Sequence, residues 1–269
     1  MITASENFFE IFLLGLIQGI TEFFPVSSSG HLVIGQKLFS LEFPNSSFEI
    51  LLHFGTLISI FIFFWKDIRN IIIEMYKECL NYKNESYQFN SIGWLILIAT
   101  IPAALFGFLF EDFFDSLFNK TKIVGFSLII TGVFLYASSK FRFSNLSKTP
   151  NWKHAFLIGL IQVIALIPGI SRSGFVIASG IILGMSRTDA TKFSLLLGIP
   201  TIGGAVIVKS VTLSKLEDIP WEGYTIGILT SCLIGILAIS LLMKAAKKTN
   251  FKSFAIYCSA IGLITLFLF

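Results

Sequence analysis

Charged side chains are scarce in this chain. Lys, Arg, Asp and Glu together make up 13% of its 269 residues, whereas an ordinary soluble domain has about 25%. Hydrophobic residues make up 54%, and the mean hydropathy is +0.81. This composition argues strongly against a water-soluble globule, so the sequence predicts one membrane-embedded domain over residues 1–269.

Cysteine is also scarce, and the basic residues form no patch. Cys79, Cys232 and Cys258 are an odd, scattered set, so they indicate neither a disulfide framework nor a metal site. The formal net charge is +4, but the basic residues cluster at the ends of apolar runs, which predicts no nucleic-acid partner. The first Lys or Arg is Lys37, so the start lacks the basic region of a cleavable signal peptide.

Long apolar runs take the place of the missing charges. Runs of about 20 residues predict membrane-spanning helices, and the chain has about six, over 91–110, 122–140, 224–243, 252–269, 48–65 and 191–211. Four further apolar pieces are mostly too short to span alone, namely 8–24, 31–41, 154–167 and 174–185. They form two pairs, each meeting at a polar Pro/Ser/Gly tip. The predicted fold is therefore an all-α polytopic membrane protein with two re-entrant or broken-helix hairpins.

The two hairpins form an internal repeat. Each has a Gly and a Gln near the end of its first apolar piece, and each has a Ser and a Gly in its tip. The matched pairs lie at one constant spacing and are Gly15 and Gly159, Gln18 and Gln162, Ser27 and Ser171, and Gly30 and Gly174. The repeat divides the domain into a first half of about 8–140 and a second half of about 154–269.

The charges outside the spans predict the orientation of the chain. Four basic residues lie in 66–90 beside four acidic ones, 140–153 and 244–252 contain basic residues and no acidic ones, and acidic residues predominate in 111–121 and 213–223. Because basic loops stay in the cytoplasm, the two halves are predicted to cross the membrane in opposite directions, as an inverted repeat whose broken helices meet near the midplane. The stretch 66–90 is predicted to contain an amphipathic helix on the inner surface.

The first tip carries a carboxylate between apolar residues. Glu22 follows an apolar helix, and Gln18 lies one turn earlier on the same face. Intramembrane carboxylates are functional by default, so this pair is a candidate for holding a metal-bound water or a proton relay; a helix-end acid at an interface is the alternative. The serines at 27–29 exceed what an N-cap requires, and with His31 they give a nucleophile–base spacing. A buried histidine without a catalytic role fits that spacing too.

The second tip carries an arginine at the equivalent point, between Ser171 and Ser173. The guanidinium fork of Arg172 suits phosphate or carboxylate binding, and a structural pairing with Glu22 is the alternative. If the two tips meet, they combine a carboxylate, hydroxyls, an arginine and two helix N-termini, which predicts a phosphate-ester ligand. Glu49 and His53 share a helix face and are candidates for a supporting layer behind this site.

With these motifs, the chain resembles the undecaprenyl-diphosphate phosphatase family of bacterial membrane enzymes, which is linked to bacitracin resistance. The resemblance rests on residues 19–31, 48–56 and 168–174 and covers essentially the whole chain. It implies a hydrolase that converts a C55 polyprenyl diphosphate to the monophosphate and inorganic phosphate, recycling the lipid carrier of cell-wall synthesis. It further implies a divalent cation, Mg²⁺ or Ca²⁺, and an active site at the outer face of the cytoplasmic membrane.

The resemblance also implies residue roles. Glu22, Ser28, His31 and Arg172 match the catalytic residues, with Ser28 as nucleophile and His31 or Glu22 as its base; His31 as the nucleophile is the rival assignment. Glu22 would also ligate the cation. Family members often have an acid where this chain has Gln18, so a two-carboxylate metal site is in question. The expected diphosphate-binding residues are Ser27, Ser29, Gly30, Ser171, Ser173 and Gly174.

Two other functions stay open. A second family of membrane lipid phosphatases uses a Pro-Ser-Gly-His element and a Ser-Arg pair followed by His and Asp. Residues 29–31 and 171–172 are similar, but residues 173–180 contain no His. A polyprenyl-phosphate transporter or flippase would also be built from inverted repeats with broken helices. The sequence sets no oligomeric state, so a homo-oligomer stays open as well.

Overall fold

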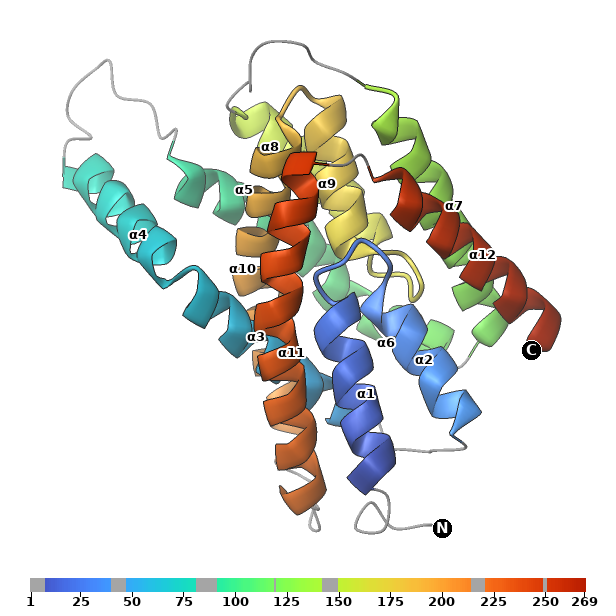
Figure 1. Ribbon diagram of the computed structural model, residues 1–269. Helices are drawn as coiled ribbons and strands as arrows, with labels where there is room; N and C mark the ends of the chain where they lie inside the picture. The colour runs from blue at the N-terminus through green and yellow to red at the C-terminus, as the bar shows by residue number, and fades with distance from the viewer. Residues whose placement is uncertain are drawn as a thin grey trace.

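The computed structural model describes residues 8–39, 47–80, 91–118, 120–141, 150–213, 221–248 and 251–269. All the helices and strands assigned in these ranges are α-helices, so the predicted all-α class is confirmed (Figure 1). The helices are α1 (Phe8–Thr21), α2 (Ser28–Leu38), α3 (Ser47–Phe63), α4 (Trp65–Leu80), α5 (Ile92–Leu109), α6 (Glu111–Phe118), α7 (Thr121–Ser139), α8 (Trp152–Ile164), α9 (Arg172–Ile182), α10 (Arg187–Leu213), α11 (Trp221–Lys248) and α12 (Lys252–Leu268).

Four of these helices, α5, α7, α10 and α11, are long and apolar enough to cross a membrane. The apolar helix α3 would give a fifth span together with α4, but the two are bent by 76° at the break between them. The predicted span at 252–269 forms α12, which is apolar but has only 17 residues. Length and composition thus support a membrane protein with four or five such spans in the described ranges, and a total of about six stays a prediction.

The two predicted hairpins correspond to two pairs of short helices, and their re-entrant course in a membrane stays a prediction. Helix α1 packs against α2, and α8 packs against α9. Each break contains a proline, Pro25 or Pro168, which has no N–H to continue a helix. Each second helix then starts with a serine N-cap: the Ser27 hydroxyl accepts from the N–H of Gly30, and the Ser171 hydroxyl accepts from the N–H of Gly174. The repeated sequence therefore produces the same local structure twice.

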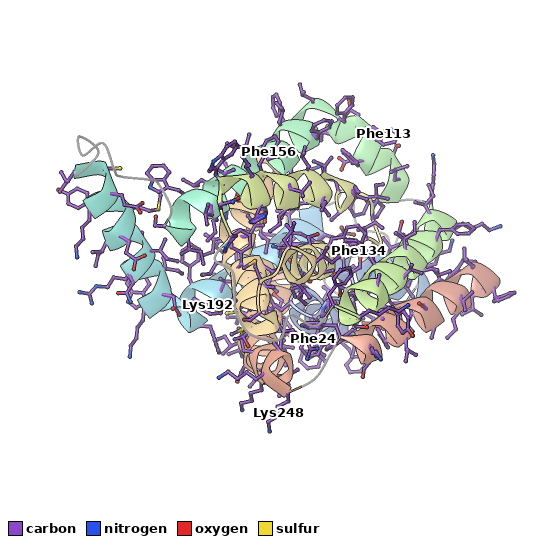
Figure 2. All side chains as sticks on the ribbon, turned by 90° about the horizontal axis from the view of Figure 1, so that it is seen from above. Phe24, Phe113, Phe134, Phe156, Lys192 and Lys248 are labelled. Carbon is purple, nitrogen blue, oxygen red and sulfur yellow. The ribbon has the colours of Figure 1, made fainter. Side chains whose placement is uncertain are left out.

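Helix α4 stands away from the bundle in both views (Figures 1 and 2). It carries charged residues along its length, and none of its residues is buried. The predicted amphipathic helix in 66–90 is thus confirmed over residues 66–80, whereas 81–90 lie outside the described residues. Its position on the inner membrane surface stays a prediction.

The remaining helices pack through small residues. Helix α11 packs against α1 and α3, α5 packs against α8 and α10, and α7 pairs with α12. At Gly19 an added Cβ would lie 2.8 Å from a side-chain atom of Ile234, and at Gly125 it would lie 2.9 Å from Leu266. Close helix contacts of this kind are typical of membrane proteins. Outward-facing leucines of α11, such as Leu233 and Leu237, are exposed, as expected for a surface that contacts lipid.

Candidate active site

The two hairpin tips lie against each other. The Gly169 N–H donates to the Ser29 hydroxyl at 3.3 Å, and the Ser173 hydroxyl donates to the Phe24 carbonyl oxygen at 3.1 Å. At Gly30, an added Cβ would be 3.1 Å from the Cα of Gly169, so the backbones approach too closely for a larger residue to fit without a shift. The hypothesis that the tips meet is confirmed.

Glu22 is the centre of this contact and is only 6% exposed. Its Oε1 accepts from Arg172 Nη2 at 2.9 Å. Its Oε2 accepts from Ser28 Oγ at 2.6 Å and from Gln18 Nε2 at 3.0 Å, and His53 Nε2 lies 3.3 Å from the same oxygen. Residues from four different segments therefore satisfy one buried carboxylate, which would otherwise be costly to keep charged in a membrane.

His53 adds positive charge to the site. Its Nδ1 lies 2.7 Å from the backbone carbonyl oxygen of Glu49, and its Nε2 faces the Glu22 carboxylate. Because a carbonyl oxygen and a carboxylate oxygen both accept, the ring satisfies both contacts only with a proton on each nitrogen. An imidazolium and the Arg172 guanidinium then flank the Glu22 carboxylate, so two cationic donors lie beside the cavity in which an anion could bind.

The Arg172 side chain crosses from the second tip to the first. Arg172 is the first residue of α9, and its Nη1 also contacts Thr201 Oγ1 of α10 at 3.4 Å. An added Cβ at Gly198 would come within 3.0 Å of the same Nη1. The guanidinium is therefore positioned between Glu22, Thr201 and the bare backbone of α10, with 18% of its side chain still exposed.

Ser28 is placed by an unusual backbone conformation. It is the first residue of α2, and the preceding Ser27 has φ 71°, in the left-handed region that is costly for a residue with a side chain. Strained residues of this kind persist where the surrounding structure holds them and are often found at functional sites. In this conformation the Ser28 hydroxyl is directed to the Glu22 carboxylate.

His31 faces away from Glu22. Its Nδ1 lies 2.8 Å from the Ser27 carbonyl oxygen, and its Nε2 lies 2.9 Å from the Tyr257 hydroxyl, with the two rings stacked 5.6 Å apart. Since the carbonyl can only accept, Nδ1 carries the hydrogen and Nε2 accepts from Tyr257. No hydrogen bond among the described residues joins His31 to Ser28. The geometry therefore pairs Ser28 with Glu22.

The other predicted site residues divide into two groups. The side chains of the tips surround a cavity, and those that line it are Ser27, Ser29, Ser171 and Ser173. Gly30 and Gly174 are not among the described residues that line it, and their N–H groups donate to the two N-cap hydroxyls at 3.2 and 3.0 Å. Glu49 and His53 both line the cavity, and Glu49 Oε1 accepts from Gln36 Nε2 at 2.9 Å.

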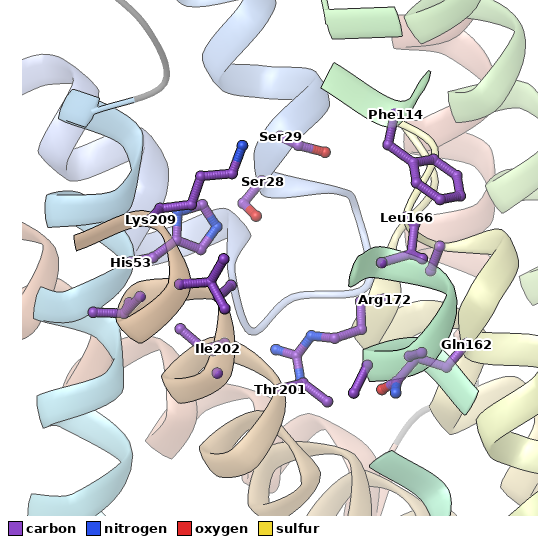
Figure 3. A pocket seen from close by; sticks show the side chains of 18 of the residues that line it. Ser28, Ser29, His53, Phe114, Gln162, Leu166, Arg172, Thr201, Ile202 and Lys209 are labelled. Carbon is purple, nitrogen blue, oxygen red and sulfur yellow. The ribbon is translucent and has the colours of Figure 1, made fainter. Parts of the chain in front are cut away.

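The cavity has a volume of about 420 Å³. We call the tip residues that line it its floor and the residues of α5, α6 and α10 its wall, and Figure 3 shows polar side chains such as Ser28 and Arg172 and apolar ones such as Ile202 around it. Glu22, Ser28 and Arg172 form part of the floor. A polar end joined to an apolar wall suits an amphiphile with an anionic head. The volume is within the range of about 300–1,000 Å³ that is common for small-molecule sites.

The sequence analysis missed an ion-paired cluster on the cavity wall. Lys209 of α10 contacts Glu111 Oε1 at 3.0 Å and also pairs with Asp115, both on α6. All three line the cavity. A signal was present, because Lys209 is the only charged residue in the apolar stretch 193–213. This cluster connects the two halves of the chain.

A cation could be held beside Glu22. Gln18 is fully buried, and its Oε1 has no hydrogen-bond partner among the described residues. Hard divalent cations bind carboxylate and amide oxygens; because Gln18 turns its Nε2 to Glu22, its Oε1 would join Glu22 in a cation site after a flip of the amide. The described residues contain no group of three or more His, Cys, Asp or Glu that could hold a metal ion. A cation would therefore need water and ligand oxygens to complete its coordination.

Comparison with known proteins shows the family of the chain. The family model of the bacitracin resistance protein BacA matches residues 11–264. The chain is 39% identical over 263 residues to an undecaprenyl-diphosphatase of Halothermothrix orenii, covering 97% of each chain. It is 39% identical over 266 residues to one of Methanosphaera stadtmanae (95% and 96% covered) and 40% identical over 267 residues to one of Alkaliphilus metalliredigens (96% and 97% covered). The chain therefore belongs to the BacA family of bacitracin resistance proteins.

Proposed function

We propose that this chain is an undecaprenyl-diphosphatase, a membrane hydrolase that cleaves undecaprenyl diphosphate to undecaprenyl phosphate and inorganic phosphate. Full-length similarity to proteins with that name supports the activity. The observation that carries the mechanism is the hydrogen bond from Ser28 Oγ to Glu22 Oε2 at 2.6 Å, with Arg172 on the other carboxylate oxygen at 2.9 Å. A nucleophile, a base and a charge-stabilising group thus meet in one cavity.

In the first step, Ser28 is the nucleophile. Glu22 takes the proton of the Ser28 hydroxyl while Oγ attacks the terminal phosphorus of the diphosphate. The bond from that phosphorus to the bridging oxygen breaks, and the departing undecaprenyl phosphate takes the proton from Glu22. The guanidinium of Arg172 and the N-terminal ends of α2 and α9 stabilise the negative charge on the phosphoryl group.

In the second step, Glu22 takes a proton from water, and the hydroxide attacks the phosphoserine. The bond between phosphorus and Ser28 Oγ breaks, the serine regains its proton from Glu22, and inorganic phosphate leaves. A divalent cation held by Glu22 and the Oε1 of Gln18 would neutralise the charge of the bound diphosphate. His53 keeps the Glu22 carboxylate oriented in both steps through its contact with Oε2.

The helix pairing supports an inverted repeat built from halves 8–140 and 154–269. Helix α1 packs against α11, and its counterpart α8 packs against α5. Likewise, α3 packs against α11, and its counterpart α10 packs against α5. Such an exchange of equivalent contacts is expected of two similar halves related by a two-fold axis. With about six spanning segments, the two tips would then meet near the middle of the bilayer.

The charge pattern supports an active site that opens to the outer side of the cytoplasmic membrane. Glu111 and Asp115 on the cavity wall belong to the acidic segment 111–121, which the loop charges assign to the outside. Their partner Lys209 lies near the end of α10 that leads to the acidic segment 213–223. On this assignment, the ion-paired cluster of Lys209, Glu111 and Asp115 would lie on the outer side of the membrane domain.

Release of phosphate by the purified protein in detergent micelles tests the function, because no transport is possible without a closed membrane. We expect undecaprenyl diphosphate to yield one inorganic phosphate per undecaprenyl phosphate, and Ser28→Ala to abolish this. The matched control is Ser116→Ala, since Ser116 is an exposed serine of α6 that is not among the cavity-lining residues. A folded wild-type protein that binds the lipid but releases no phosphate would favour a flippase instead.

A further inference from the structure

The apolar wall of the cavity follows two facing helices outward from the polar floor. On α5 the lining residues extend from Thr100 to Phe108, and on α10 they extend from Pro200 to Lys209. Eight residues of helix rise by about 12 Å, so the wall continues well beyond a diphosphate group bound at the floor. On α5 the lining positions recur every three or four residues, which places them on one face of that helix, whereas on α10 most positions from 200 to 209 line the cavity.

Two glycines widen this wall. An added Cβ at Gly204 of α10 would meet no atom within 4 Å, and one at Gly107 of α5 would meet only Leu166, at 3.8 Å. Both glycines line the cavity. At Gly55, by contrast, an added Cβ would lie 2.1 Å from Ser231 Oγ, because the helices touch there. Packing explains the absence of a side chain at Gly55, but packing does not explain it at Gly107 or Gly204.

An unsatisfied polar atom marks the same cavity. Gln162 of α8 lines it and is only 2% exposed, and its Oε1 has no hydrogen-bond partner among the described residues. A buried acceptor without a partner is costly. The free Gln162 Oε1 indicates that a polar group, such as a water carried in with the ligand, donates a hydrogen bond to it when the cavity is occupied.

We propose that the wall of α5 and α10 around Gly107 and Gly204 binds the first prenyl units of the lipid substrate, and that the two glycines set the width of this subsite. The inference rests on the proposed function, which puts the diphosphate at the floor. The wall is continuous with that floor, is mostly apolar up to the ion-paired cluster of Lys209, Glu111 and Asp115, and has open space where the glycines lack side chains. A cavity of about 420 Å³ holds only the beginning of an eleven-unit prenyl chain, so the remainder extends into the bilayer.

Filling the subsite at one glycine tests the proposal. Gly204→Leu puts a side chain into the cavity, and the adjacent Gly203→Leu is the matched control, because Gly203 is not among the lining residues and its added Cβ has only Leu57 nearby, at 3.8 Å. Neither glycine has a positive φ, and leucine has a higher helix propensity than glycine. Both variants should therefore fold, which thermal melting and size-exclusion chromatography in detergent would verify.

The substrates are undecaprenyl diphosphate and isopentenyl diphosphate, which has a single prenyl unit. We expect Gly204→Leu to lower kcat/KM for undecaprenyl diphosphate by at least about tenfold, the lower end of what a steric mismatch in an apolar pocket costs. We expect Gly203→Leu to remain within about twofold of the wild type. Cleavage of isopentenyl diphosphate, measured at high enzyme concentration, should fall less than that of undecaprenyl diphosphate in Gly204→Leu, because a single prenyl unit occupies only the start of the wall, and should stay unchanged in Gly203→Leu. Gly107→Leu, on the facing helix, should reproduce the loss.

Two results would overturn the subsite, and a third would overturn the proposed function on which it rests. Wild-type kcat/KM on undecaprenyl diphosphate in both Gly204→Leu and Gly107→Leu would overturn the subsite. An equal loss on the long and the short substrate would also overturn it, because the leucine would then disturb the floor rather than the prenyl chain. If the wild-type protein itself released no phosphate from undecaprenyl diphosphate, the proposed function would fail, and the subsite with it; this outcome is distinct from the other two.

Discussion

Replacing Arg172 by lysine separates charge from geometry at the contact between the two tips. The arginine places Nη2 at 2.9 Å from Glu22 Oε1 and Nη1 at 3.4 Å from Thr201 Oγ1. Its remaining N–H groups can therefore reach a phosphoryl group while the contact to Glu22 persists. A lysine keeps the charge but has a single nitrogen and no planar fork, so it cannot hold the carboxylate and the phosphoryl group in the same arrangement.

The size of the loss follows from the role of Arg172 in the transition state. Removing one preorganised donor that stabilises developing charge costs about 100- to 1,000-fold in kcat, so Arg172→Lys should lose at least that range. Arg172→Ala should lose more and also destabilise the fold, because Glu22 would keep a buried charge without its Oε1 partner; breaking a buried pair costs about 3–5 kcal/mol. The double variant Arg172→Ala/Glu22→Gln should recover part of this stability.

The assay is phosphate release from undecaprenyl diphosphate in detergent, with each variant checked for monodispersity. Added Mg²⁺ or Ca²⁺ should not restore Arg172→Lys, because the defect is geometric. A near-wild-type kcat for Arg172→Lys would refute the reasoning and leave Arg172 as a structural partner of Glu22. Recovery of stability in the double variant without any effect of Arg172→Lys on kcat would lead to the same conclusion.

Three further predictions concern the base, the arginine and the orientation. Glu22→Gln should lose most activity while remaining folded, and excess chelator should abolish hydrolysis by the wild type; full activity in chelator would remove the cation from the mechanism. Gly198→Ala should lower kcat by several-fold, up to the roughly 100-fold that a 1 Å misplacement can cost, because its Cβ would lie 3.0 Å from an Arg172 nitrogen, with a small loss of thermal stability from its contact with buried Ile60 at 3.1 Å; an unchanged kcat would argue against tight positioning. A reporter fused after Lys148 should be cytoplasmic and one after Asp115 external, and the reverse would overturn the outward-facing site.

The helices and the meeting of the tips were predictable from local sequence. Apolar runs and prolines determine where helices form and end, so the breaks at Pro25 and Pro168 were visible without a structure. The sequence analysis raised a pairing of Glu22 with Arg172 as the alternative to a ligand-binding role for the arginine, and the structure shows this contact at 2.9 Å. These features depend on residues near each other in sequence or on charges too costly to leave unpaired in a membrane.

Contacts between distant helices were less predictable. Spacing along one helix suggested that Ser28 and His31 act together, yet Tyr257 of α12 takes the second nitrogen of His31. Helical periodicity shows which residues share a face, but it does not show which other helix that face meets. For the same reason the sequence did not indicate that His53 would contact Glu22, nor that α3 and α4 would be bent by 76°.

The identity of the phosphorylated residue during turnover tests the central claim most directly. The wild-type protein would be mixed with undecaprenyl diphosphate, quenched within one turnover, digested and analysed by mass spectrometry. The hydrogen bond of 2.6 Å between Ser28 and Glu22, together with the orientation of His31 towards Tyr257, predicts phosphate on Ser28. Phosphate on His31 instead would contradict the account.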